Sequence, residues 1–178
     1  MRIRLRSIIQ LVLRSCVTRF AGGAEVATVF DVAKYILTKS GRISCMKLQK
    51  LVYYSQAWSL VWDDAPLFPE PIEAWVNGPV VPELYYAHKG QFDVTSVQIH
   101  GNIESLTDGQ RETIDAIIDF YGKHSSQYLS DLSHNEQPWK VARQGLAPDA
   151  RGETVITLDS MAEYYGSLTK NADGQESQ

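Results

Sequence analysis

Two neighbouring stretches, MKLQKLVYYSQAW (residues 46–58) and PIEAWVNGPVVPELYYAHK (residues 71–89), decide how this chain folds. In the first, Leu48, Leu51 and Trp58 recur at the period of a helix with one buried face. Three prolines and a glycine interrupt the second stretch, so a long helix is excluded there. We therefore predict a long helix followed by an irregular, aromatic segment whose side chains suit a contact surface.

Local capping signals set the ends of the first two helices. Thr28 and Asp31 form a capping-box pair, and Gly41 provides a C-terminal stop, so one helix is expected between them. Ser44 can cap the next helix, which should end near Asp63.

The long helix is predicted to have three faces. Its apolar stripe should face the core, and Lys47, Lys50 and Tyr54 should form the wetter side. The polar face between them consists of Gln49, Tyr53 and Gln56. These groups either brace the proline-rich crossing from inside or face a ligand, and we favour bracing. We also treat Gln49 as exposed, so that replacing it by alanine should leave stability nearly intact.

The segment around Asn77 and Gly78 carries conflicting signals. Asn-Gly favours a hairpin, but Pro79 follows at once and cannot donate to a ladder. We therefore expect Pro79 and Pro82 to hold an extended crossing, with Pro82 opening a helix that stops at Gly90.

The rest of the chain reads as short elements joined by short turns. We expect a weak edge strand at residues 92–100 and helices from Thr107 to Gly122, from Ser125 or Ser126 to Leu132, from Pro138 to Arg143 and from Thr157 to Gly166. The predicted fold is a compact, predominantly α-helical α+β single domain with a few short β-strands.

Composition indicates an ordinary globular protein. The chain has 178 residues, a length typical of one domain, and its two cysteines, Cys16 and Cys45, form no CxxC pair. We therefore expect a reduced, cytoplasmic protein.

Charge divides the chain into a basic leader and an acidic body. All five basic residues of the first twenty positions are arginines, which leaves 12 Lys+Arg against 21 Asp+Glu, a net charge of −9, from Ala21 onward. An acidic body argues against nucleic-acid binding by the main domain and suits a basic protein partner. No apolar run is long enough for a membrane span, so no membrane association is expected.

The leader, residues 1–25, has three interpretations: a signal peptide, a basic amphipathic helix, or residues foreign to the natural protein. We favour an accessory or misassigned leader that is dispensable for folding. Residues 26–168 would then form the domain and residues 169–178 a flexible tail.

The sequence carries no recognised catalytic motif. Its four histidines are dispersed without an HExxH or paired Cys/His spacing, and it has no P-loop and no G-x-G-x-x-G. Cys45 with a distant histidine is conceivable as a nucleophile and base but lacks a motif context. We predict no enzyme activity, no metal and no cofactor.

Four segments resemble the Panacea domain family, the SocA-like antitoxin domains that include phage-associated GepA-like proteins. They are the helix at residues 32–37, I-S-x-x-K-L-Q-K-L-V-Y-Y-S-Q-A-W at 43–58, P-L-F with P-I-E-A-W-x-x-G-P-V-V-P at 66–82, and L-S-x-L-S-H-x-x-x-P-W at 129–139. The resemblance spans roughly residues 30–165, and the second and third motifs are highly specific.

This resemblance implies an antitoxin of a bacterial or prophage toxin-antitoxin pair, which neutralises a protein toxin encoded nearby. Direct inhibition and delivery of the toxin to a cellular protease both remain open, and a small-molecule-binding protein or hydrolase is the less favoured alternative. The candidate partner-binding or motif residues are Lys47, Gln49, Lys50, Tyr53, Gln56, Trp75, Asn77, Gly78, Pro79, Pro82, Tyr85, His134 and Trp139.

Overall fold

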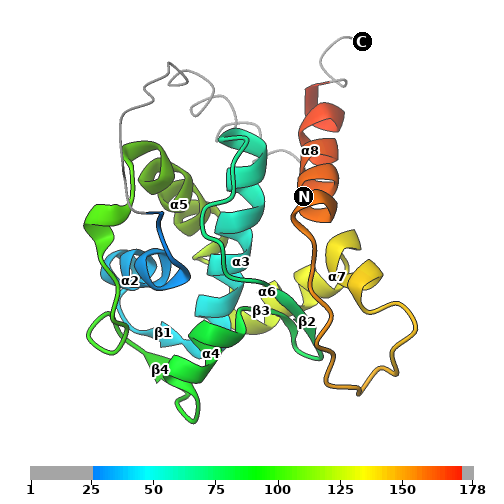
Figure 1. Cartoon of the computed structure of the whole chain (residues 1–178), viewed down its shortest axis with the longest axis horizontal. Coiled ribbons are helices and arrows are strands. Elements are labelled where there is room, and N and C mark those ends of the chain that lie inside the picture. Colours follow the sequence, from blue (N-terminus) through cyan, green and yellow to red (C-terminus); the bar gives the residue numbers. More distant parts are fainter. Residues whose placement is uncertain (1–25, 174–178) are drawn as a thin grey trace.

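The computed structural model describes residues 26–173, with side chains as far as Lys170. Within that range the protein is predominantly helical, with two small antiparallel sheets, which confirms the predicted α+β class (Figure 1). The basic leader, residues 1–25, and the last five residues of the predicted tail lie outside the described residues. The elements are α2 (Val29–Ser40), β1 (Ile43–Ser44), α3 (Cys45–Trp62), β2 (Glu73–Trp75), β3 (Gly78–Val80), α4 (Pro82–His88), β4 (Asp93–Val94), η1 (Ile103–Ser105), α5 (Asp108–Tyr121), α6 (Ser126–His134), α7 (Gln137–Ala142) and α8 (Leu158–Asp173).

Helix α3 runs through the centre of the molecule. It packs against α2 and α5 on one side and against α6 and α8 on the other, while β3 and α4 cover its N-terminal half (Figure 1). Thirteen of its 18 residues are buried, and Lys47 is half-buried. The prediction of a wetter side was therefore wrong: Lys50 is 1% exposed and Tyr54 is 0% exposed.

The predicted helix starts are confirmed by cap geometry. Thr28 forms a full capping box with Asp31 at the start of α2, and Thr107 forms one with Gln110 at the start of α5. Ser44 accepts a hydrogen bond from Lys47 N at the start of α3. These ends are set by residues three positions apart, so sequence alone identifies them.

The crossing predicted around Pro79 is instead a β-hairpin. Strands β2 and β3 pair antiparallel with Trp75 opposite Gly78 and Ala74 opposite Pro79. Ala74 N points away from β3 and donates to Thr154 O (2.9 Å), so the pair opposite Pro79 needs no hydrogen bond from proline. The proline therefore fits at this register, and the prediction of an extended crossing in place of a hairpin was wrong.

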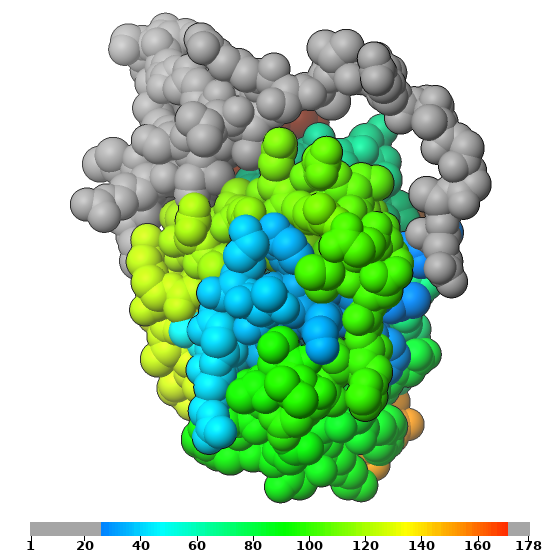
Figure 2. All heavy atoms as spheres, turned by 90° about the vertical axis from the view of Figure 1, so that its left-hand side faces the viewer, coloured from blue at the N-terminus to red at the C-terminus, as the bar shows by residue number. Residues whose placement is uncertain are grey.

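The segment after α4 forms only two residues of strand. The predicted strand at residues 92–100 reduces to β4, which pairs with β1. The chain then crosses the flank of α2, where Lys34 Nζ donates to Ile99 O (3.1 Å) and Asn102 N donates to the Asp31 carboxylate. Figure 2 shows this green segment lying against the blue helix α2.

The last helix, α8, passes through Gly166 and continues to Asp173, so the predicted stop at Gly166 was wrong. A glycine inside a helix costs only about 1 kcal/mol relative to alanine. Tyr165, which is fully buried, and Leu168, which packs on the core, anchor α8 on both sides of that glycine. Tertiary packing therefore outweighs the local signal.

Candidate functional site

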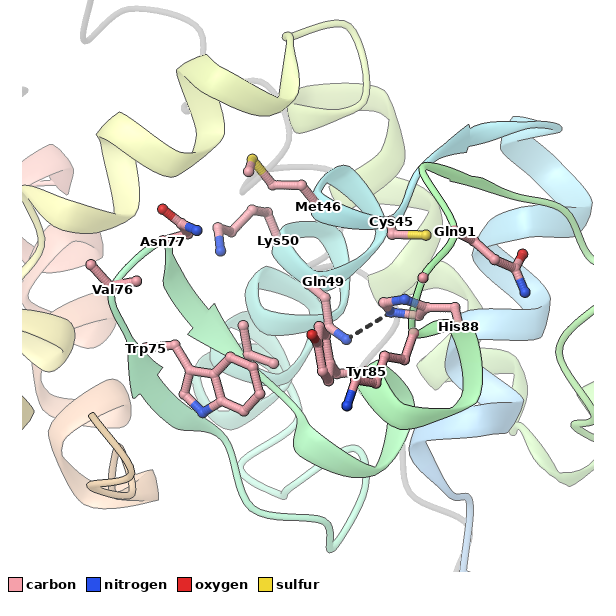
Figure 3. A pocket seen from close by; sticks show the side chains of 13 residues that line it. Cys45, Met46, Gln49, Lys50, Trp75, Val76, Asn77, Tyr85, His88 and Gln91 are labelled. Carbon is pink, nitrogen blue, oxygen red and sulfur yellow. Dashed lines mark hydrogen bonds between the residues drawn. The ribbon is translucent and has the colours of Figure 1, made fainter. Parts of the chain in front are cut away.

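A pocket of about 250 Å³ opens where the start of α3, the β2–β3 hairpin and α4 meet (Figure 3). Met46, Trp75, Val80 and Tyr85 supply much of its apolar wall. The rings of Trp75 and Tyr85 meet edge to face with centroids 4.8 Å apart. The complete lining is Cys45, Met46, Gln49, Lys50, Trp75, Val76, Asn77, Val80, Tyr85, His88, Lys89, Gly90 and Gln91.

Gln49 fixes the side of the pocket where β3 leads into α4. Its Oε1 accepts a hydrogen bond from Val81 N (2.9 Å), and its Nε2 lies 3.1 Å from His88 Nε2 (Figure 3). Burial lowers the pKa of His88, which favours the neutral ring beside the amide. This geometry confirms bracing for Gln49. Because Gln49 is only 3% exposed, the expectation that it lies on the surface was wrong.

Lys50 lies at the floor of the pocket behind the hairpin turn. Its Nζ donates to Pro79 O (3.0 Å), and within the described residues no carboxylate lies within 4 Å of it. Burial lowers the Lys50 pKa to about 7. A Cβ at Gly78 would lie 2.7 Å from this Nζ, so the turn packs directly on the amine.

Gln56 braces a different loop from the one predicted. Its Oε1 accepts hydrogen bonds from Leu67 N (2.7 Å) and Phe68 N (3.2 Å), and its Nε2 donates to Phe68 O (2.9 Å). Gln49 and Gln56 are seven residues apart on α3, so each holds one irregular segment against the same helix.

A buried carboxylic acid, Glu136 at the start of α7, joins α3 to α8. Tyr165 Oη donates to Glu136 Oε2 (2.6 Å) and also lies 3.3 Å from Tyr53 Oη. The Tyr54 hydroxyl approaches Glu136 at 3.4 Å. Desolvation raises the Glu136 pKa to about 7, and burial raises the pKa of all three tyrosines. Tyr53 therefore belongs to this internal cluster.

Helix α7 fastens the outer strand of the hairpin. Trp139 Nε1 donates to Trp75 O (3.0 Å), and Arg143 Nη1 donates to Ala74 O (3.0 Å). His134 stacks on Trp139 with ring centroids 4.2 Å apart, and its buried Nε2 has no partner within the described part of the chain. Burial and then the charge of Lys50 lower the His134 pKa.

The structure divides the predicted site residues into three groups. Gln49, Lys50, Trp75, Asn77 and Tyr85 line the pocket, Gly78, Pro79 and Pro82 belong to the backbone that frames it, and Lys47, Tyr53, Gln56, His134 and Trp139 lie elsewhere. Lys47 Nζ, for example, donates to Gly122 O at the end of α5. The sequence did not predict Met46, Val80 and His88 as pocket residues, because no local sequence signal shows that the hairpin and α4 fold back over α3.

Two polar side chains of the pocket, Gln49 and His88, bind each other, and the thiol of Cys45 is not activated as a nucleophile. Burial, and after it the charge of Asp93, raise the pKa of Cys45, the opposite of thiolate activation. Among the described residues no three metal-ligating side chains gather into a site. Within the same range no helix is long and apolar enough to cross a membrane.

A family profile described as "Antitoxin SocA-like, Panacea domain" matches residues 48–140. The chain belongs to this family. The matched span of the Panacea domain covers most of α3, the hairpin, α4, α5, α6 and part of α7, and thus every pocket residue except Cys45 and Met46. No curated protein and no solved structure matches the chain.

Proposed function

We propose that this Panacea-domain protein is the antitoxin of a bacterial or prophage toxin-antitoxin pair and neutralises its toxin by direct contact. The observation that carries the proposal is the family match, which includes the central helix and the hairpin packed on it. The toxin is a protein encoded nearby, and the acidic body of the chain suits a basic partner.

The toxin contact is assigned to the hairpin face, which we define as Trp75, Val76, Tyr85 and Tyr86, whose three rings lie in contact along the hairpin and α4. Val76 is 38% exposed and Tyr86 is 56% exposed, although both are apolar enough to favour burial. Such residues, when clustered, mark interaction sites. Aromatic groups are also the usual anchors of protein interfaces.

The hairpin face is held rigid from behind. Trp139 binds Trp75 O, Lys50 binds Pro79 O and Gln49 binds Val81 N. A surface fixed before association loses little conformational entropy when a partner binds. These internal bonds therefore support binding without rearrangement of the hairpin.

Neutralisation is proposed to require no catalysis. The raised pKa of Cys45 disfavours a thiolate in the pocket, and the amide of Gln49 occupies His88 Nε2. In a cytoplasmic setting Cys45 would remain a buried free thiol. The domain thus acts as a binding module, and its phage association would explain a toxin encoded beside it.

Co-expression with the neighbouring gene tests the proposal. We expect rescue of growth and a complex that co-purifies. Tyr86→Arg should abolish both, whereas Asp119→Arg adds the same side chain at an exposed position on α5 and should preserve both. Rescue by a folded variant that no longer binds the toxin would overturn neutralisation by contact, and loss of intact toxin during rescue would favour proteolytic delivery.

A further inference from the structure

The pocket beneath the hairpin face has a charge opposite to that of the chain. Its lining contains two lysines, Lys50 and Lys89, but no aspartate or glutamate. The whole chain, by contrast, has 21 Asp+Glu against 17 Lys+Arg. The acidic body of the protein repels anions, whereas the lysines of this lining attract them. An anionic group is therefore the favoured ligand of the pocket.

The two lysines occupy different depths. Lys89 is exposed at the rim, where its Nζ lies 5.6 Å from the centroid of the Tyr86 ring. Lys50 is at the floor and makes one hydrogen bond, to Pro79 O, although an ammonium has three donors. A cation buried without an anion is costly, so an incoming anion is favoured over a neutral group.

The remaining surface is apolar and the space is small. Met46, Val80, Trp75 and Tyr85 form walls for a hydrophobic body. The volume of about 250 Å³ lies below the roughly 300–1,000 Å³ typical of drug-sized ligands. It suits a fragment or one amino-acid side chain.

We propose that this pocket is a binding site for a carboxylate carried on a short apolar or aromatic stem. The stem lies against Trp75 and Tyr85, and the carboxylate is received by Lys89 at the rim and faces the field of Lys50 from the floor. A free small acid and the acidic end of a bound polypeptide share this chemistry. This proposal does not depend on the antitoxin function, because ligand binding is measured on the free protein without a toxin.

Direct contact between a ligand and Lys50 requires the lysine side chain to move, because it is buried. Lys50 is 1% exposed. Its ammonium reaches a ligand only when the flexible lysine stem turns from Pro79 O toward the pocket. Burial lowers the Lys50 pKa to about 7, so an adjacent carboxylate would stabilise the charged amine.

The test is titration of the free protein with 3-phenylpropionate, monitored by amide and indole NMR. We expect a Kd of about 1 mM or tighter, with shifts concentrated at the Trp75 indole and the Gly90 amide. The neutral isostere 3-phenylpropanamide should bind at least about tenfold more weakly. No shift at ~10 mM acid, equal binding of the amide, or shifts located away from the pocket would overturn the proposal.

Lysine variants assign the charge. Lys89→Met should weaken 3-phenylpropionate at least about threefold without changing amide binding. Lys50→Met should weaken it about tenfold or more, while Lys140→Met, an exposed lysine on α7, should have no effect. Unchanged affinity in Lys89→Met, which needs no refolding of the core, would contradict the assignment even if Lys50→Met fails to fold.

A second titration identifies the source of the carboxylate. If the toxin supplies it, the purified toxin complex should exclude 3-phenylpropionate. If a free acid is the ligand, the complex should still bind it. The free-protein titration decides the site itself, so its failure leaves the growth-rescue test of antitoxin function unaffected.

Discussion

Gln49 holds the backbone of Val81 from inside the core, and we expect its loss to be costly. Gln49→Ala leaves the buried Val81 N–H and the His88 ring without their amide partner. An unsatisfied buried donor costs about 1–3 kcal/mol, so unfolding free energy should fall by about 2–3 kcal/mol in urea titrations. Gln144→Ala, at an exposed position, should change it by less than about 0.5 kcal/mol. If both variants lose equally little unfolding free energy, Gln49 does not brace the backbone at Val81.

The polar residues of α3 show where residue patterns mislead. Lys50, Tyr54 and Gln49 look like a solvated face, because polarity and spacing are all that the sequence displays. Their burial depends on loops and on α8, which arrive from far along the chain. The sequence supported bracing for Gln49, since a buried amide needs partners, but it did not reveal which loop Gln56 would hold.

At the scale of the elements, the β2–β3 turn depends on Gly78. Gly78 has φ of +99°, and an added Cβ would approach Lys50 Nζ to 2.7 Å. Gly90 has a similar φ of +86° but open space around its Cβ position. Gly90→Ala should therefore cost only the left-handed backbone penalty, about 1–2 kcal/mol.

Gly78→Ala should cost more than Gly90→Ala in urea unfolding, because the end of Lys50 must shift and lose its hydrogen bond to Pro79 O, which adds about 0.5–1.5 kcal/mol to the same backbone penalty. Gly78→Val should be more severe and should also impair toxin neutralisation, since the hairpin face is displaced. Equal costs for the two alanine variants would show that Lys50 and the turn adjust without strain.

Helix caps were predictable from sequence because their partners lie within one turn, as at Thr28 and Asp31. The hairpin was not, because Pro79 is tolerated only in the register that places it opposite Ala74. That register depends in turn on residues 154–156, which pair with the far edge of β2. The aromatic segment at residues 71–89 contributes Trp75 and Tyr85 to the pocket, but the pocket also requires the start of α3, which the local sequence does not place beside them.

At the scale of the whole molecule, a buried acid and a buried amine each lack an oppositely charged partner among the described residues. Glu136 is surrounded by tyrosine hydroxyls, and Lys50 by the hairpin backbone. Burial desolvates both groups, so folding favours the uncharged form of each. The acid and the amine therefore make stability respond to pH in opposite directions.

Folding raises the Glu136 pKa from 4.5 to about 7, so its contribution is complete below pH 4.5 and is lost as the pH rises through 7. Folding lowers the Lys50 pKa from 10.5 to about 7, so its contribution grows as the pH rises above 7. Urea unfolding at several pH values should show that wild type loses on the order of 2 kcal/mol relative to Glu136→Gln between about pH 5 and pH 7. Relative to Lys50→Met, it should gain on the order of 2 kcal/mol between about pH 7 and pH 9. Comparison with Glu136→Gln cancels the titration of His88 and His134. Lys50→Met also removes the charge that lowers the His134 pKa, so the Lys50 comparison is confined to pH 7 and above, where an ordinary histidine is already mostly neutral. Parallel curves would show that neither buried group changes its protonation on folding.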